Sequence, residues 1–461
     1  DLGGHSLSAI SLMNRIDHSF SVSIALRDIF IHKDIRSLCK HILGLETIEL
    51  VGITKAKEAS SYVLSSAQRR MYFLYEFNKQ STTYNMPGVF RLGDDLDEDR
   101  FTASIEQLVL RHESLRTLFF IEEGEVRQQI GNGLDFEVSY ASMSEALLED
   151  HIASFMRPFD LSREYPFRVG LVSIEEGGYL LLLDLHHIIS DGLSQDILLR
   201  DFVGLYMGAE LAPLEIQYKD YAVWQQSGVQ QSLMESDKGY WLELYRDSVS
   251  VLDLPTDRPR PLMSDDAGGI VSFTIADDKA KGLREIASGC DTTVYMVLLS
   301  IYNVFLSKLG NTEDVIVGTP TSGRHHGDLE EVVGMFVNTL ALRSSVKGDQ
   351  TYSSYLETVK QMALSCFDHQ MYQYEDLVDA LALDRDTSRN PLFDVMFSYF
   401  KQDDSVADEL PMSIDVYEGA ALKETSKFDL SLTVTDYPDS FAMSLSYRTR
   451  LFEKETIDRF L

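Results

Sequence analysis

The residues His186-His187-Ile188-Ile189-Ser190-Asp191-Gly192 decide how this 461-residue chain is interpreted. They follow the apolar run Tyr179 to Leu185, which predicts a buried strand, and they precede a helical pattern from Ser194 to Tyr206. A strand–turn–helix junction displays side chains at the edge of a cleft, which suits catalysis. Neighbouring residues of a strand point to opposite faces, so we expect one histidine to face the cleft and the other to be buried.

Asp191 and Gly192 complete this stretch. We expect Asp191 to neutralise a basic group and hold the turn, and Gly192 to adopt a φ angle that a side chain would resist. The alternative is a structural turn with two hydrogen-bonded histidines. The whole spacing has a chance occurrence on the order of one in a thousand in a chain of average composition, which favours the functional interpretation.

The composition excludes several classes of protein. The 41 Lys and Arg against 73 Asp and Glu give a formal net charge of −32, which argues against a nucleic-acid partner and an anionic membrane surface. Hydrophobic residues make up 44% and charged residues 25%, which is typical of a globular protein. No signal peptide opens the sequence, and the most apolar stretch, Val294 to Leu306, is too short to span a bilayer and predicts a buried helix.

The cysteines and paired histidines predict neither a disulfide framework nor a metal site. Cys39, Cys290 and Cys366 are far apart and odd in number, which fits a reducing cytoplasm. His325 and His326 lack a third ligand at a workable spacing, so we expect a solvated loop there.

Apolar spacing divides the chain into a small helical unit, a linker and a mixed α/β body. Patterns at Ser6–His18 and Ile35–Leu43 predict the helices of the small unit, and residues 45–61 predict the linker. Strands and helices alternate from residue 62 onward, and the proline-rich segment Leu254–Pro261 predicts a boundary between two lobes. Both ends look cut, so we expect a piece of a longer polypeptide.

The elements of the body follow from the period of the apolar residues and from capping residues. The predicted helices are Ser66–Phe77, Glu98–His112, Ser194–Tyr206, Thr293–Leu309, Ser353–Asp368 and Glu453–Leu461. The predicted strands are Gly88–Leu92, Val126–Ile130, Phe136–Ser139, Tyr179–Leu185, Ile270–Ile275, Val315–Thr319 and Asp394–Phe400.

Several motifs together resemble the core motifs of condensation domains of nonribosomal peptide synthetases. The histidine stretch resembles their HHxxxDG motif. The others occur in family order and cover roughly residues 62–460; they are Ser66-Ala67-Gln68-Arg69-Arg70-Met71-Tyr72, Arg111-His112-Glu113-Ser114-Leu115-Arg116-Thr117, Tyr218-Lys219-Asp220-Tyr221-Ala222-Val223-Trp224, Gly318-Thr319-Pro320-Thr321-Ser322-Gly323-Arg324, Gly334-Met335-Phe336-Val337-Asn338-Thr339 and Arg385-Asp386-Thr387-Ser388-Arg389-Asn390-Pro391-Leu392.

Two places depart from the family pattern. The stretch His369-Gln370-Met371-Tyr372-Gln373-Tyr374-Glu375 stands where the family usually has HQDxPFE, without its proline and acid. Leu193 stands where the family often has tryptophan.

The N-terminal stretch Leu2-Gly3-Gly4-His5-Ser6-Leu7 resembles the attachment motif of peptidyl carrier domains. A serine at an exposed helix start is open to a transferase, and a phosphate attached there meets the positive end of the helix. An ordinary N-capping serine is the alternative. The resemblance implies that a phosphopantetheinyl transferase attaches 4′-phosphopantetheine to Ser6.

The resemblance implies a small all-α carrier fragment at 1–44, a linker at 45–61 and a condensation domain at 62–461. The condensation domain is expected to have the α/β two-lobed, chloramphenicol acetyltransferase-like fold, with an N-lobe at about 62–250, a C-lobe at about 262–461 and a tunnel between them. Two phosphopantetheine arms would enter from opposite faces. The amine of an acceptor aminoacyl thioester would attack a donor acyl or peptidyl thioester.

The resemblance also assigns roles to residues. His187 would lie at the centre of the tunnel, either as a general base or as a group that orients the amine and stabilises charge. His186, Asp191 and Gly192 complete the catalytic motif, and no metal is needed. The candidates for a structural or tunnel role are Arg116, Arg111, Arg324 and Asn338, the arginines as cationic partners of a carboxylate.

Alternatives remain open beside this interpretation. An epimerisation domain shares the two histidines, and a non-enzymatic relative would recruit tailoring enzymes instead. A heterocyclisation domain, which has aspartates in their place, is nearly excluded. The stretch Ser66 to Tyr72 resembles the form that accepts an L-configured donor and an L-configured acceptor. The expected partners are the upstream and downstream carrier and adenylation domains of the same assembly line.

Overall fold

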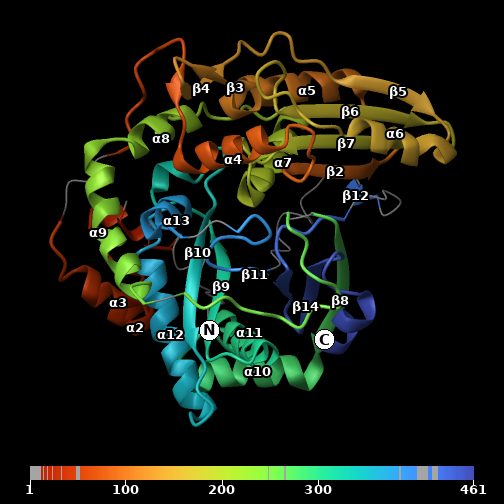
Figure 1. Ribbon diagram of the computed structural model, residues 1–461. Coiled ribbons are helices and arrows are strands. Elements are labelled where there is room, and N and C mark those ends of the chain that lie inside the picture. The colour runs from red at the N-terminus through yellow and green to blue at the C-terminus, as the bar shows by residue number, and fades with distance from the viewer. Residues whose placement is uncertain are drawn as a thin grey trace.

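The computed structural model describes residues 12–13, 15–17, 19–22, 24–32, 34–47, 52–247, 249–263, 266–383, 386–401, 414–417 and 424–461. Two bodies built on β-sheets lie one above the other, and α9 (Gly228–Leu244) runs along one side (Figure 1). We call the upper body the N-lobe and the lower body the C-lobe. Ser6 and Arg385 lie outside the described residues.

The N-lobe contains a five-stranded sheet of order β12-β2-β7-β6-β5 and a three-stranded sheet of order β1-β4-β3. Helix α5 packs against α7, and α8 packs against β1 of the three-stranded sheet. The strands are β1 (Tyr62–Val63), β2 (Asn85–Leu92), β3 (Thr117–Glu122), β4 (Glu125–Ile130), β5 (Ser139–Met143), β6 (Phe167–Ile174) and β7 (Tyr179–His186). The helices are α4 (Ser66–Phe77), α5 (Glu98–Arg111), η1 (Glu113–Arg116), η2 (Glu145–Leu147), α6 (Leu148–Phe155), α7 (Gly192–Tyr206) and α8 (Tyr218–Gln225).

The C-lobe is built on a six-stranded sheet of order β10-β9-β11-β13-β14-β8. The buried helix α11 packs against β9, and α12 packs against β10 and α11. The strands are β8 (Gly268–Ala276), β9 (Asp314–Thr321), β10 (Asn338–Ser345), β11 (Val395–Lys401), β13 (Leu430–Asp436) and β14 (Ser440–Arg448). The helices are α10 (Asp277–Gly289), α11 (Val294–Gly310), η3 (Gly327–Leu329), α12 (Tyr352–Asp368), α13 (Tyr374–Leu381) and α14 (Lys454–Phe460).

The two lobes exchange segments. The short strand β12 (Ile414–Val416) comes from the C-terminal half of the chain but pairs antiparallel with β2 of the N-lobe. In the other direction, Trp241 near the end of α9 is buried in the core of the C-lobe, and its indole N–H donates to the carbonyl of His369 at 2.8 Å. A boundary at a single position therefore does not describe how the lobes are held together.

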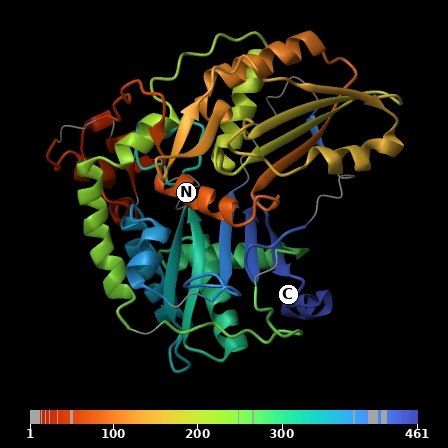
Figure 2. The ribbon, with the colours of Figure 1, turned by 45° about the horizontal axis from the view of Figure 1, so that its top comes forward.

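The N-terminal helices α2 (Leu26–Ile31) and α3 (Ile35–Ile42) form a small unit beside the C-lobe. Among its described residues, Ile16, Val22, Ile24 and Ile42 form a buried core. Helix α2 packs against α12, and Arg15 approaches Glu330 at 3.7 Å. In both views this unit lies on the same side as α9, while β8 and β14 lie on the other side (Figure 1 and Figure 2).

The predicted elements agree with the structure where the apolar pattern was long and the ends of the helix carried capping residues. The helix predicted at Ser66–Phe77 is correct at both ends, and its start is fixed by Ser65, which accepts from the N–H of Gln68 at 3.1 Å. The predicted strand Phe136–Ser139 is wrong, since β5 begins at Ser139 and pairs with β6. Phe136 instead lies in the loop that leads into β5, where its ring stacks on Phe167. Its apolar side chain is therefore explained by packing in the core and not by a strand.

A cluster of aromatic rings joins the lobes behind the histidine turn. Tyr218 on α8 packs against Phe336 with ring centroids 4.8 Å apart, and its hydroxyl hydrogen-bonds Ser65 at 2.7 Å. Gly334 lies directly against the Tyr218 ring, and a Cβ at Gly334 would overlap that ring. The contact between the lobes therefore requires the absence of a side chain at this position.

We predict that Gly334→Ala destabilises the protein by more than the about 1–3 kcal/mol typical of overpacking, because the Tyr218 ring is buried and cannot move aside. Urea unfolding measures the loss. Gly282→Ala on α10 is the matched control, since a Cβ there meets nothing within 4 Å and alanine favours a helix by up to about 1 kcal/mol. An equal effect of the two substitutions would contradict the role of Gly334.

Candidate functional site

The end of β7 places the two histidines in different environments. His186 is buried edge-on against Tyr75 and Phe159, and its Nδ1 accepts from the N–H of Ile188 at 3.1 Å. His187 is only half-buried, and its backbone N–H donates to the carbonyl of Tyr84 at 2.8 Å. Only His187 can therefore offer its side chain to a ligand.

The ring of His187 is held in one tautomer. Its Nδ1 lies 2.8 Å from the carbonyl oxygen of Ser190, which can only accept, so Nδ1 carries the hydrogen and Nε2 keeps a lone pair. Burial, followed by the nearby charge of Lys427, lowers the pKa of His187 to about 4. At neutral pH the imidazole is therefore neutral, with Nε2 able to accept a hydrogen bond.

Asp191 joins the histidine turn to the C-lobe. It caps α7 by accepting from the N–H of Ser194 at 2.8 Å, and it accepts from the N–H of Phe336 at 3.1 Å. Its arginine partner is Arg324, whose Nη2 lies 3.2 Å from Oδ1. With 1% and 6% of their side chains exposed, Asp191 and Arg324 form a buried ion pair between the lobes.

Arg324 and Ser194 complete this junction. The guanidinium also donates to the carbonyls of Leu329 and Val332, at 2.7 and 2.6 Å, and lies 4.1 Å from the centroid of the Phe336 ring. Ser194 Oγ donates to Asp191 at 2.7 Å and accepts from the N–H of Gly334 at 3.0 Å. These contacts hold the turn after His187 against the loop that follows β9.

The expected reason for Gly192 is wrong. Gly192 is the first residue of α7 and does not have a positive φ angle. A Cβ at this position would meet nothing within 4 Å, so neither backbone strain nor packing within the protein requires glycine here. The structure instead leaves open space beside the start of α7.

Arg111 and Arg116 are bound within the N-lobe and do not join Asp191. Arg111 Nε donates to Asp201 on α7 at 2.7 Å, beside His112, and Arg116 Nε donates to the carbonyl of Val109 at 3.3 Å. Arg116 also binds the carbonyl of Gly131. Both therefore stabilise the packing of α5 against its neighbours.

Asn338 anchors the loop that departs from the family pattern. Its Nδ2 donates to the carbonyls of Gln370 and Tyr372, both at 3.0 Å, and its Oδ1 accepts from the N–H of Tyr374 at 3.2 Å. Glu375 at the start of α13 then pairs with Arg70 on α4 at 3.0 Å. The loop is thus held to both lobes although the proline of the family motif is absent.

The sequence analysis did not identify Lys427, which lies near His187. Lys427, in the turn before β13, places its Nζ 4.6 Å from the centroid of the Tyr84 ring. Burial, followed by the nearby charge of Arg70, lowers the pKa of Lys427 to about 8. The only signal was a basic residue at the start of an apolar strand, which by itself does not distinguish a site from a solvated turn.

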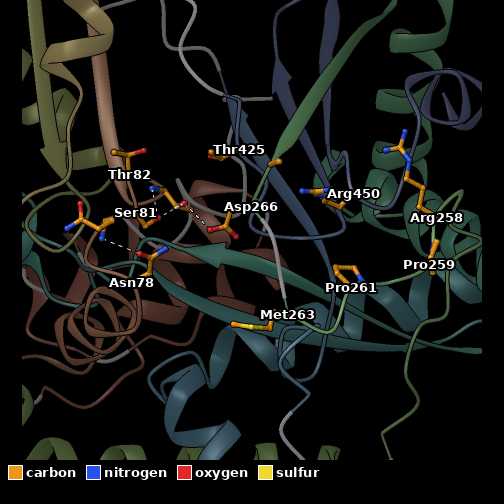
Figure 3. A pocket seen from close by; sticks show the side chains of 13 residues that line it. Asn78, Ser81, Thr82, Arg258, Pro259, Pro261, Met263, Asp266, Thr425 and Arg450 are labelled. Atoms are coloured by element: carbon orange, nitrogen blue, oxygen red, sulfur yellow. Dashed lines mark hydrogen bonds between the residues drawn. The ribbon is translucent and has the colours of Figure 1, made fainter.

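A cavity of about 760 Å³ opens between the lobes, and its lining includes Thr83 beside Tyr84 and Thr425 two residues before Lys427. Figure 3 shows Asn78, Ser81 and Thr82 on one wall, and Arg258 and Arg450 on another. Thr83 donates to Asp266 across the cavity at 2.9 Å. His187 does not line the cavity, but Thr83 precedes Tyr84, whose carbonyl binds the N–H of His187.

No group of three or more His, Cys, Asp and Glu side chains among the described residues is arranged to hold a metal ion. His325 and His326 are both half-buried, so the expected solvated loop is only partly exposed. The Nε2 atom of His325 is shielded from solvent, and this desolvation lowers the pKa of His325 to about 4. Within the part of the chain that the structure describes, no single helix is long and apolar enough to cross a membrane; α10 and α11 meet the length and composition test only as a pair bent by 106°.

We predict that Asp191→Asn destabilises the protein by about 3–5 kcal/mol, because Arg324 would remain as a buried charge without its carboxylate. Urea unfolding of Asp191→Asn, Arg324→Gln and the double variant measures the coupling, and the double variant should cost less than the sum. Glu243→Gln, in an exposed pair with Arg246, is the control and should cost about 0–1 kcal/mol. A fully stable but inactive Asp191→Asn would instead indicate a direct chemical role.

Comparisons with known proteins agree with this geometry. The profile of the family described as "Condensation domain" matches residues 58–461, and that described as "Phosphopantetheine attachment site" matches residues 1–42. The chain is 40% identical over 459 residues to surfactin synthase subunit 1 of Bacillus subtilis (strain 168) and 41% identical over 460 residues to gramicidin S synthase 2 of Brevibacillus brevis. Both alignments cover 100% of this chain, which spans only 13% and 10% of those relatives.

Solved structures share the fold. The X-domain in its complex with OxyB from teicoplanin biosynthesis superposes with a TM-score of 0.81 at 23% identity, covering 90% of this chain and 94% of that one. A four-domain nonribosomal peptide synthetase bound to AMP and glycine superposes with a TM-score of 0.78 at 20% identity, covering 91% of this chain and 33% of that one. The chain therefore belongs to the condensation-domain family of nonribosomal peptide synthetases, whose domains form peptide bonds, and it carries a phosphopantetheine attachment site at its N-terminal end.

Proposed function

We propose that this chain forms a peptide bond between a donor acyl or peptidyl thioester and the amine of an acceptor aminoacyl thioester. The observation that carries the proposal is the ring of His187, which is fixed through Nδ1 and keeps Nε2 as a free acceptor at the junction of the lobes. Phosphopantetheine, when attached to a carrier, supplies a thiol on a long arm that holds each acyl group as a thioester.

His187 Nε2 accepts a hydrogen bond from the acceptor amine and orients the nitrogen lone pair toward the thioester carbon. An α-amine has an ordinary pKa near 8 and is partly neutral at pH 7, so little base strength is needed before attack. As the C–N bond forms, the amine N–H becomes acidic and Nε2 takes up the proton. His187 then returns this proton to the departing thiolate sulfur, which restores the neutral imidazole.

Features at the two edges of the C-lobe sheet support separate entry routes for the donor and acceptor thioesters, from opposite sides of the domain. The N-terminal unit packs on α12, which packs on the edge strand β10. The cavity beside Asp266 and Arg450 opens next to β8 and β14, at the other edge of the same sheet. We assign the donor to the side of the N-terminal unit and the acceptor arm to this cavity.

The proposed organisation is a carrier fragment at 1–44, a linker at 45–61 and a condensation domain at 62–461, with lobes at about 62–250 and 262–461. The linker is held to the condensation body, which supports a fixed placement of the carrier. The N–H of Ile53 donates to Asp328 at 2.9 Å, and the N–H of Ala56 donates to Asp220 at 2.8 Å.

The proposed partners are the adenylation and carrier domains of the same assembly line, together with a phosphopantetheinyl transferase that modifies Ser6. The net charge of −32 opposes a nucleic-acid or anionic membrane partner. Cys39, Cys290 and Cys366 are free thiols, which supports a reducing compartment such as the cytoplasm.

Recruitment of another protein is the second candidate function. It is favoured by the structural likeness to the X-domain solved in complex with OxyB, a likeness that concerns the fold alone. The free Nε2 of His187 favours the enzymatic function, because a docking domain needs no lone pair between its lobes. An epimerisation domain would also use His187, and it is separated from a condensation domain by whether a peptide bond forms.

We predict that His187→Ala lowers the single-turnover rate of peptide-bond formation by about 10²–10⁴-fold without unfolding the protein. Mass spectrometry of the acceptor thioester measures the product. His151→Gln on α6 is the control and should keep the wild-type rate. If His187 mainly orients the amine, some donor–acceptor pairs will keep part of their activity, whereas wild-type rates for all pairs would remove it from the mechanism.

The pH dependence follows from the same residue. The neutral imidazole is the active form, and its pKa is lowered from 6.5 to about 4. After correction for protonation of the acceptor amine, the fall in rate on the acid side of the pH profile should therefore lie near pH 4. A fall near pH 6.5 would contradict the burial of this ring.

We predict that Ser6 accepts one phosphopantetheine from coenzyme A in the presence of a phosphopantetheinyl transferase. Intact-mass measurement should show one added arm on the wild-type chain and on Ser8→Ala, and none on Ser6→Ala. Modification of Ser6→Ala, or none of the wild type, would refute the assignment.

We predict that the donor Cα is L-configured and that its configuration is preserved. The motif Ser66 to Tyr72 resembles the L-donor form, and exchange of hydrogen and side chain at Cα would misdirect the thioester carbon relative to His187. The test is to supply matched L- and D-configured donors with the same acceptor and to compare how much product each donor forms. Preference for the D-donor would overturn the subtype and leave the condensation function standing.

A further inference from the structure

Lys427 approaches His187 from the opposite lobe. Its Nζ lies 4.6 Å from the centroid of the Tyr84 ring, and the carbonyl of Tyr84 accepts from the N–H of His187 at 2.8 Å. Lys427 and His187 therefore flank the same residue, one from the C-lobe and one from the N-lobe. They are also close enough for the charge of Lys427 to act on the imidazole.

The turn that carries Lys427 is firmly anchored. The carbonyl of Lys427 accepts from Nδ2 of Asn390 at 3.0 Å and from Nη2 of Arg448 at 2.7 Å. Two residues on, Asp429 pairs with Arg448 at 3.3 Å and also with Arg260. An anchored turn holds the lysine in place at little further entropic cost, as a preorganised site requires.

The amine of Lys427 is not used by this anchoring. Among the described residues, no oxygen lies within hydrogen-bonding or ion-pairing distance of Nζ, and Asp266 is engaged by Thr83 Oγ1 at 2.9 Å. Partial removal of water from an ammonium that makes no ion pair costs free energy, which the more distant charge of Asp266 offsets only in part. An oxygen that gains negative charge beside His187 would offset this cost.

We propose that Lys427 is a catalytic residue of the condensation reaction, whose ammonium donates a hydrogen bond to the carbonyl oxygen of the donor thioester while His187 binds the acceptor amine. The proposal rests on the proposed function. It gives the two lobes separate tasks, since the N-lobe holds the nucleophile and the C-lobe stabilises the oxygen.

The reaction balances with these two residues. The amine lone pair forms the C–N bond while the C=O electron pair moves to oxygen, and the Lys427 ammonium stabilises the resulting charge without transferring a proton. His187 Nε2 takes one proton from nitrogen. The oxygen electron pair then reforms C=O, the C–S bond breaks with its electrons on sulfur, and His187 protonates the thiolate.

The test compares single-turnover rates of the full chain with saturating donor and acceptor thioesters. Lys427→Met should lose about 10²–10³-fold in rate, as expected for loss of one oxyanion donor, with donor and acceptor binding unchanged. Lys427→Arg, which keeps charge and donors, should recover part of the rate. Lys279→Met, an exposed lysine on α10, is the matched control and should keep the wild-type rate.

The pH profile separates catalysis from a structural role. The wild-type rate should fall as pH rises past about 8, where Lys427 loses its proton. Lys427→Met should lack this alkaline limb, and Lys427→Arg should shift it upward. The titratable and charged groups around the amine are Arg70 on α4, Tyr84 before β2, His186 at the end of β7, His187 in the turn after β7, Asp266 before β8, and Asp429 and Arg448 at the ends of β13 and β14.

A wild-type rate for Lys427→Met would overturn the proposal. The proposal would also be overturned if Lys427→Met lowered both the rate and the melting temperature but left the alkaline limb of the pH profile unchanged. Lys427 would then act only by supporting the Tyr84 ring. Absence of product with the wild-type chain would refute the proposed function itself. Loss of product on His187→Ala with no effect of Lys427→Met would refute only this inference.

Discussion

The buried pair of Asp191 and Arg324 is the contact on which the arrangement of the site depends. Asp191 is at once the cap of α7 and the acceptor for a cation from the other lobe. Because an unpaired charge buried here would be costly, the turn after His187 and the loop after β9 are stable only together. Ser194 and the backbone of Gly334 close the same network, so the geometry of the N-lobe site is defined by residues of the C-lobe.

The chemistry of His187 follows from this constraint. A ring at the end of a free strand could rotate and would be protonated near its ordinary pKa. Here the turn fixes the carbonyl of Ser190 against Nδ1, and burial keeps the imidazole neutral. The other histidine, His186, supports the turn from within the core, where it packs against Tyr75 and Phe159. One residue of the pair is thus available to substrate because the other fills the core.

Exchange of segments between the lobes limits how far they can move apart. Strand β12 pairs with β2, α9 buries Trp241 in the C-lobe, and Arg70 pairs with Glu375. None of the residues in these three contacts lines the cavity beside Asp266. The lobes are therefore held together by contacts that leave this space open.

The amino-acid pattern alone determined most of the local elements and the identity of the central motif. The apolar run before His186 has to be a buried strand, and the sequence Ser65 to Gln68 has to begin a helix, since both depend only on neighbouring residues. Tertiary structure alone decided how the ring of His187 is held, that Arg324 and not Arg111 or Arg116 pairs with Asp191, and that Lys427 approaches His187. The reason is physical: Arg324 and Asp191 lie 133 residues apart in the sequence. Their pairing depends on how the two lobes pack against each other, and a local pattern of apolar residues carries no information about that packing.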